Sequence, residues 1–183
     1  MNSSSRALPS TGRVSWRETL VLMVASWLVP FLVHFIPSFG PREIGVYLIP
    51  AFWATFVAVY FGGALVGAVV ALVTPIVNLL LTGLPALPWL GTMSIELVAF
   101  ALCTAGLVRR WPNLWLIAPL GYLPAKAVAI ALQWAVPAFD YHRAPLAHLL
   151  SSTQNAAPGL AVLLAVNFAL VKLAPRDLDW DHE

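Results

Sequence analysis

The stretch "VALVTPIVNLLLTGLP" (residues 70–85) is almost entirely apolar, yet it contains a proline, a threonine and Asn78 before it stops at Thr82-Gly83-Leu84-Pro85. Glycine followed by proline is typical of the end of a helix. An unpaired amide in hydrocarbon is costly, because no water is present to satisfy it. The stretch therefore predicts a membrane helix in which Asn78 faces either a neighbouring helix or a wet cavity.

The composition of the whole chain supports a membrane protein. Of its 183 residues, 60% are hydrophobic and only 10% are charged, whereas about a quarter of the residues in a soluble domain are charged. The net charge of +2 comes from scattered residues rather than a basic run, so we expect no nucleic-acid partner. The single cysteine, Cys103, excludes an intramolecular disulfide.

Helix-breaking residues divide the chain into apolar segments, each close to the roughly 20 residues that a bilayer crossing requires. We predict six helices, at residues 19–36, 44–61, 64–82, 91–108, 113–136 and 157–173. The predicted fold is all-α: a polytopic membrane protein whose six transmembrane helices form one domain. The predicted divisions are a mobile cytoplasmic tail at 1–15, the transmembrane domain at 16–174 and a short acidic cytoplasmic tail at 175–183.

The distribution of basic residues predicts the orientation. A cytoplasmic N-terminus places seven lysines and arginines inside and two outside, which fits the positive-inside rule. The seven are Arg6, Arg13, Arg17, Arg109, Arg110, Lys172 and Arg176, and the two are Arg42 and Arg143. Tryptophans then lie at both interfaces, with Trp89 at the outer one. We therefore expect both termini in the cytoplasm.

The second and third predicted helices meet at Gly62-Gly63, which leaves room only for a tight hairpin. Gly63, Gly67 and Ala71 recur at four-residue spacing along the third helix. Small residues at this spacing allow a neighbouring backbone to approach closely. We interpret the stripe as structural.

With the helix directions assigned, most intramembrane polar residues fall in the outer half of the membrane. Glu96 and Lys126 are the most costly of them, since an ionisable residue in a span costs on the order of 2.5–3.5 kcal/mol. They need water, a ligand or each other, and three alternatives remain: a small polar solute, mutual pairing as structural support, or a proton relay. The candidate substrate-binding residues are His34, Asn78, Trp89, Glu96, Lys126, Gln133 and Asn155.

Signatures of several enzyme and metal-binding classes are missing from the sequence. There is no G-x-x-x-x-G-K-[ST], H-E-x-x-H or G-x-S-x-G, and no Cys/His metal spacing. We therefore expect neither enzymatic activity nor a cofactor or bound metal ion. Transport against a gradient would need energy from partner proteins or coupled ions.

The order of segments resembles a known family. "LIPAFWATFVAVYFGGALVGAVVALVTPIVNLLLTGLP" (48–85) and "MSIELVAFALCTAGLVRR" (93–110) are similar to the substrate-binding S components of energy-coupling factor (ECF) vitamin transporters. There, a hairpin with small residues leads to an apolar helix, a G-x-P loop and a helix that carries a glutamate. The segments "LIAPLGYLPAKAVAIALQW" (116–134) and "NAAPGLAVLLAVNFALVKL" (155–173) resemble the fifth and sixth helices of that family.

The resemblance implies a six-helix subunit in the bacterial cytoplasmic (inner) membrane that captures a water-soluble vitamin or related micronutrient from outside. Its partners would be a transmembrane coupling subunit and two cytoplasmic ATPases. By position, Glu96, Lys126 and Asn155 fall on the helices that usually contact ligand, and the loops at 37–43 and 82–91 would be lids.

A non-transporting role is the alternative. The cell-shape protein MreD family is also small and helical with about this many spans. In such a scaffold, the polar side chains would only join helices together.

Overall fold

The computed structural model describes two long parts of the chain, residues 47–135 and 145–174, together with selected residues near the N-terminus. Those selected residues are Arg17, Leu20, Val21, Val24, Trp27, Leu28 and residues 31–33, all of them helical. His34, the predicted lid at 37–43 and both predicted tails lie outside the described residues, so these predictions remain untested.

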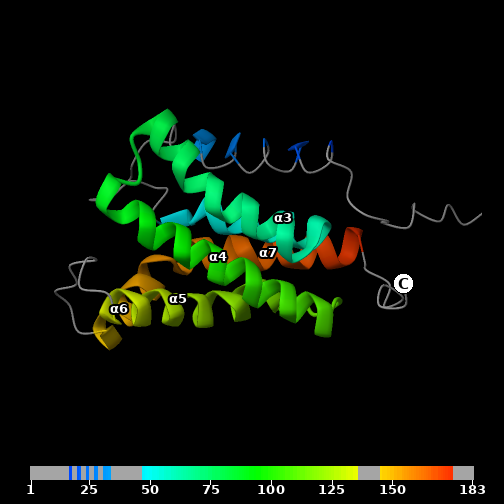
Figure 1. Cartoon of the computed structure of the whole chain (residues 1–183). Coiled ribbons are helices and arrows are strands. Elements are labelled where there is room, and N and C mark those ends of the chain that lie inside the picture. Colours follow the sequence, from blue (N-terminus) through cyan, green and yellow to red (C-terminus); the bar gives the residue numbers. More distant parts are fainter. Residues whose placement is uncertain are drawn as a thin grey trace, which may run out of the picture.

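Every regular element in the described parts is a helix, which confirms the all-α prediction at the level of fold class (Figure 1). The helices are α3 (Pro50–Thr82), α4 (Leu87–Arg110), α5 (Ile117–Ala135), α6 (Pro145–Asn155) and α7 (Ala157–Leu173). The helix α3 packs on α4, α4 on α5, and α7 packs on both α3 and α5. The result is a bundle of roughly antiparallel helices, with α6 at one end.

The helix α3 is a hairpin of two legs rather than one straight rod. Its backbone leaves the helical conformation at Gly63, where φ is 74° and ψ is −168°. A Cβ added at Gly67 would lie 3.3 Å from the Cα of Val59, whereas eight residues of straight helix span about 12 Å. The chain therefore reverses at Gly63, a positive-φ position that glycine adopts without strain. This confirms the predicted hairpin and the close approach at Gly67.

The end of α3 follows the turn chemistry of the sequence. Gly83 adopts the left-handed conformation with φ of 75°, and its N–H donates to the carbonyl of Leu79 at 2.9 Å, as in a common helix C-terminus. The Thr82 hydroxyl donates to the Asn78 carbonyl at 2.8 Å and accepts from the Leu84 N–H at 3.2 Å. Only residues 83–86 are non-helical here, so the loop is shorter than the predicted 82–91.

The helices α4 and α5 are antiparallel and in close contact. A Cβ at Gly121 of α5 would collide with the methyl group of Thr104 on α4, so the absence of a side chain at Gly121 permits their approach. The turn between them begins at Trp111, whose N–H donates to the Leu107 carbonyl at 2.8 Å. Helix α5 begins at Ile117, four residues later than the predicted start at residue 113.

The segment before α7 differs from the expected connection. The predicted helices at 113–136 and 157–173 leave only a connection between them, yet residues 145–155 form α6. A bend of 64° separates the Leu149–Asn155 helix from α7. The predicted helix at 157–173 has the observed bounds of α7. Gly159 on α7 faces the backbone of Leu48, which leaves no room for a side chain there.

Apolar and aromatic side chains from α3, α4, α5 and α7 fill the centre of the bundle. Phe52 packs edge-on against Phe100 and Tyr122, with ring centroids 5.0 Å and 5.1 Å apart. Leu163 of α7 is fully buried in the same cluster. One aromatic cluster therefore joins helices that are distant in sequence.

The outside of the bundle is strongly apolar, as expected for contact with lipid. Within the described parts, two helices are long and apolar enough to cross a membrane, or three if the bent α6–α7 pair counts as one span. Exposed large side chains such as Leu65, Leu80 and Leu123 point away from the core. These features indicate a membrane protein.

Candidate functional site

The centre of the site is an ion pair between two helices. The Lys126 ammonium lies 2.7 Å from Glu96 Oε1, and the two side chains are 14% and 10% exposed. Lys126 is at the middle of α5, and Glu96 lies in the N-terminal half of α4. The structure therefore brings together the two charged residues predicted from the sequence, and it pairs them with each other.

The antiparallel packing of α4 and α5 explains why the pair forms. Thr104 faces Gly121 where the two helices are closest. Moving from that contact toward the start of α4, eight residues lead to Glu96, while five residues of α5 lead to Lys126. At about 1.5 Å per residue these shifts differ by roughly 5 Å, which the long stem of lysine spans easily.

Aromatic side chains lie directly next to the pair. The Lys126 ammonium is 5.9 Å from the centre of the Tyr122 ring, one helical turn away on α5. Tyr122 in turn contacts Phe52 at 5.1 Å. A cation within about 6 Å of an aromatic face is stabilised by it. Tyr122 was missed in the sequence analysis, although its position four residues before Lys126 is a usable signal.

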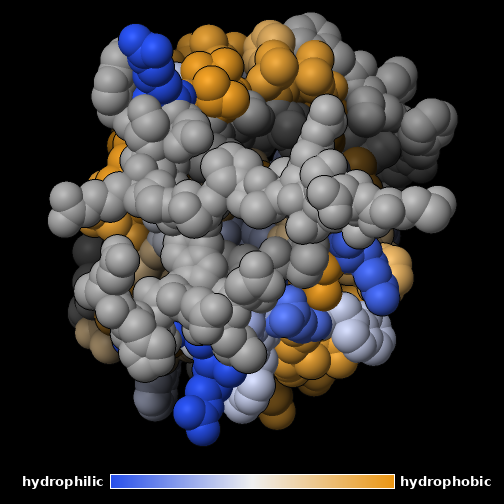
Figure 2. Space-filling view, turned by 90° about the vertical axis from the view of Figure 1, so that its right-hand side faces the viewer, coloured by the Kyte–Doolittle hydropathy of each residue, from blue (hydrophilic) through white to orange (hydrophobic). Residues whose placement is uncertain are grey.

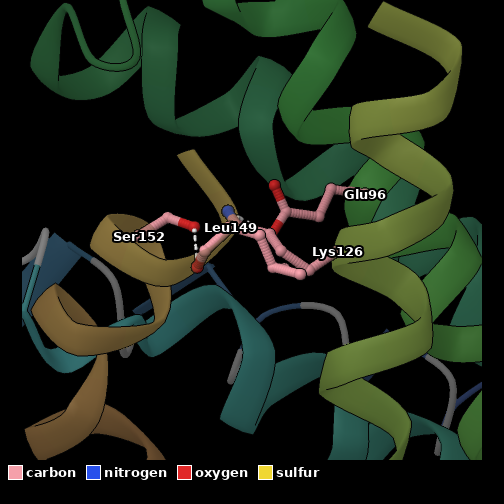
Figure 3. Close-up of polar contacts among 4 residues, drawn as sticks. All are labelled: Glu96, Lys126, Leu149 and Ser152. Carbon is pink, nitrogen blue, oxygen red and sulfur yellow. Dashed lines mark hydrogen bonds and ion pairs between the residues drawn. The ribbon is translucent and has the colours of Figure 1, made fainter. Parts of the chain in front are cut away.

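Helix α6 covers one side of the pair. The helices α5 and α6 are in contact, and Figure 3 shows Leu149 and Ser152 of α6 close to the point where the two charged groups meet. The Ser152 hydroxyl donates to the Leu149 carbonyl of its own helix at 3.1 Å. Ser152 is only partly buried, so a hydroxyl with a weak local bond lies at the edge of the site.

Asn78 lies on the neighbouring helix and is nearly inaccessible. Its side chain is 3% exposed, and its amide oxygen has no hydrogen-bond partner among the described residues. One turn earlier, the fully buried Thr74 hydroxyl is also unpartnered. Buried polar atoms are nearly always satisfied, so this face of α3 has an unfilled capacity for hydrogen bonding.

The remaining predicted residues are more peripheral. Trp89 is 55% exposed in the first turn of α4. Asn155 is partly buried at the last position of α6, at the bend before α7. Gln133 belongs to α5, but its side chain is outside the described part of the structure. None of the described contacts joins Trp89 or Asn155 to the Glu96–Lys126 pair.

Asn167 shows how a buried polar residue can act only as support. It is fully buried on α7, where its Oδ1 accepts from the Ala118 N–H at 2.8 Å and its Nδ2 donates to the Leu114 carbonyl at 3.3 Å. The Ala118 N–H belongs to the first turn of α5, which has no partner within its own helix. Asn167 therefore caps α5 from a neighbouring helix.

The chemistry of the site is that of polar recognition. In the described residues, no group of three or more His, Cys, Asp or Glu side chains is placed to hold a metal ion. The pair offers one cation, one carboxylate and adjacent aromatic rings.

Comparisons of the chain with protein-family models, with curated proteins and with solved structures found no match.

Proposed function

We propose that this chain is a membrane-embedded substrate-binding subunit that captures a small water-soluble vitamin or related micronutrient from the extracytoplasmic side. The observation that carries the proposal is the Glu96–Lys126 pair, held between helices at 2.7 Å with a small exposed fraction on each side chain. Charges at this depth are expensive, and in membrane proteins they commonly mark a substrate pathway.

The burial of the pair supports a functional role over a stabilising one. Removing two charges from water costs several kcal/mol per ion, and their attraction often does no more than offset this cost. Neutral side chains hold membrane helices together without that penalty, as Asn167 does on α7. Two full charges in place of an amide are better explained by a solute that needs them.

The positions of the other basic residues indicate which end of the helix bundle would face the cytoplasm. Lys172 is in the last turn of α7, and Arg109 and Arg110 are in the last turn of α4. Both helices finish at the same end of the bundle, where hydrophilic residues lie beside apolar ones (Figure 2). Under the positive-inside rule this end would be cytoplasmic, and the proposal includes six spans with both termini on that side of a bacterial inner membrane.

The resemblance to ECF S components extends the proposal to partners. In that arrangement, a transmembrane coupling subunit and two cytoplasmic ATPases would supply the energy for uptake. Affinity purification of the full chain from its native membrane tests this part, because the expected result is recovery of an ATPase pair. Recovery of cell-morphogenesis proteins instead would contradict it.

Native mass spectrometry of the detergent-extracted protein tests the binding function. We expect a co-purifying small molecule that is lost in Glu96→Gln and in Lys126→Gln. Lys172→Gln is the matched control, since this exposed lysine stacks on Phe168 far along α7 from the site. Absence of any small molecule, or equal retention in all variants, would remove the proposed site.

A scaffold of the kind found in the MreD family is the second candidate. The observation in its favour is that Glu96 and Lys126 satisfy each other, as structural support between α4 and α5 would require. In that case neither residue binds a solute. Both single variants would lower stability, and no small molecule would be found with the wild-type chain.

A further inference from the structure

The Glu96–Lys126 pair is electrically neutral, and Glu96 is the one acidic residue in the described part of the chain. The remaining described basic residues are Arg17, Arg109, Arg110 and Lys172. Of these, Arg109, Arg110 and Lys172 belong to the last turns of α4 and α7. A ligand entering between Glu96 and Lys126 therefore meets one positive and one negative group. If the ligand leaves one of these groups without a partner, no third charge among the described contacts of the pair compensates it.

A ligand with a single charge is poorly suited to such a site. An anion that takes Lys126 leaves the Glu96 carboxylate buried, unpaired and next to another negative charge. A cation that takes Glu96 strands the Lys126 ammonium in the same way. Leaving one partner of a buried pair uncompensated is strongly unfavourable, and a neutral solute offers neither group a full countercharge.

A zwitterion avoids both penalties. Its cationic group can pair with the Glu96 carboxylate while its anionic group pairs with the Lys126 ammonium, so that every buried charge keeps a partner. The flexible four-carbon stem of Lys126 allows its ammonium to move aside without moving α5. Ser152 at the edge of the site donates to the Leu149 carbonyl of its own helix at 3.1 Å, and rotation of its hydroxyl would let it bond the ligand instead.

Resting on the function proposed above, we propose that the site selects a small zwitterion, which exchanges partners with the Glu96–Lys126 ion pair. The ion pair is then the empty state of the site, and it keeps both charges paired until the ligand arrives. The recognised chemistry is a cationic group and an anionic group on one molecule. A free solute carries this chemistry, and so does the headgroup of phosphatidylethanolamine.

Equilibrium dialysis of the full chain in detergent tests the charge requirement. The probes are three matched series: ω-amino acids from glycine to 6-aminohexanoate, the corresponding carboxylates, and the corresponding alkylamines. We expect at least one amino acid to bind on the order of a hundredfold more tightly than the carboxylate and amine of equal length. Equal binding by a singly charged probe overturns the inference, and so does the absence of binding by every amino acid and by short-chain phosphatidylethanolamine.

Two variants turn the same measurement into a selectivity switch. Glu96→Gln removes the need for a cationic group on the ligand. The affinity for carboxylates, relative to the affinity for amino acids of equal length, should therefore rise by about tenfold or more. Lys126→Gln should favour the alkylamines in the same way. Lys172→Gln should leave the order of the probes unchanged. An unchanged order of the probes in both site variants would overturn the inference. Circular dichroism checks that each variant is folded. The double variant Glu96→Gln/Lys126→Gln, which leaves no unpaired charge, is a second check on folding.

The failure of this inference is distinguishable from failure of the carrier function. A co-purifying solute with one charge, lost in both site variants, would keep the carrier and reject the zwitterion. Competition by short-chain phosphatidylethanolamine alone, with no binding of free amino acids, would keep the charge requirement and assign it to a lipid headgroup. The carrier function would then be wrong.

Discussion

Two buried polar contacts connect α5 to its neighbours, and they differ in kind. At the start of α5, Asn167 accepts from the Ala118 N–H and donates to the Leu114 carbonyl, using neutral groups in a fully buried position. At the middle of α5, Lys126 and Glu96 use two full charges that keep a small exposed fraction. Both contacts join helices, but only the second is more costly than joining helices requires.

The difference separates support from recognition. The amide of Asn167 satisfies backbone groups that otherwise have no partner at a helix terminus, so its role is complete within the protein. Among the described residues, the charges of Glu96 and Lys126 pair with each other, and the Tyr122 ring lies beside the lysine. Apolar side chains can replace a buried ion pair without loss of stability, but they cannot replace its binding of a ligand. The following changes test this distinction, beginning with the largest expected effect on stability.

Removing one partner of the charged contact should have the largest effect. Lys126→Met leaves the Glu96 carboxylate between helices without a countercharge. We expect the free energy of unfolding to fall by about 3 kcal/mol, because an uncompensated buried charge is strongly destabilising. Denaturant titration in detergent micelles, followed by circular dichroism, measures the change. A loss comparable to that of an exposed Lys172→Met control would indicate that water reaches the carboxylate freely.

Removing the neutral contact should have a smaller effect. Asn167→Leu takes away the partner of the buried Ala118 N–H and of the partly buried Leu114 carbonyl. We expect a loss of about 2 kcal/mol, since each unsatisfied backbone group costs on the order of 1–3 kcal/mol and some relaxation is possible. The same titration measures it. Binding of a solute to the folded fraction should be unchanged, and a change there would give Asn167 a role in the site.

Much of this bundle was predictable because glycine and proline mark helix ends in an apolar chain. Gly63 and Gly83 are at the positive-φ positions where the chain turns or stops, and the bounds of α7 match the prediction. Glu96 and Lys126 were also identified singly, because charge is conspicuous in an apolar segment. Local chemistry was sufficient for these features.

Features that depend on packing between distant helices were not predictable in the same way. The local sequence does not show what Asn167 binds, because its partners are about fifty residues away in the sequence. The local sequence of α6 does not distinguish it from a loop, because the segment is short and Ser152 and its neighbours are polar. The choice between pairing and separate roles for Glu96 and Lys126 depended on the register of α4 against α5.

Replacing both charges together should have little effect on stability. In Glu96→Leu/Lys126→Met, no charge remains unpaired, and apolar side chains fill similar volume beside Tyr122. We expect the free energy of unfolding to stay within about 1 kcal/mol of wild type or to rise, while solute binding is lost. Unfolding and equilibrium dialysis on the same sample separate the two readouts. A large loss of stability would identify the pair as structural support and favour the scaffold.

The smallest effect on stability is expected at Asn78, the residue that interrupts the apolar stretch before Gly83. Its amide oxygen is buried without a described partner, so the amide already carries an uncompensated desolvation penalty. We expect Asn78→Leu to leave the free energy of unfolding unchanged or to raise it by up to about 1 kcal/mol. The matched change Asn167→Leu, at an amide whose groups are satisfied, should destabilise the protein. If both variants lose stability equally, Asn78 has a partner in the bilayer-embedded protein, and its amide is support like that of Asn167. If Asn78→Leu is neutral for folding yet weakens solute binding, the unfilled amide belongs to the recognition site.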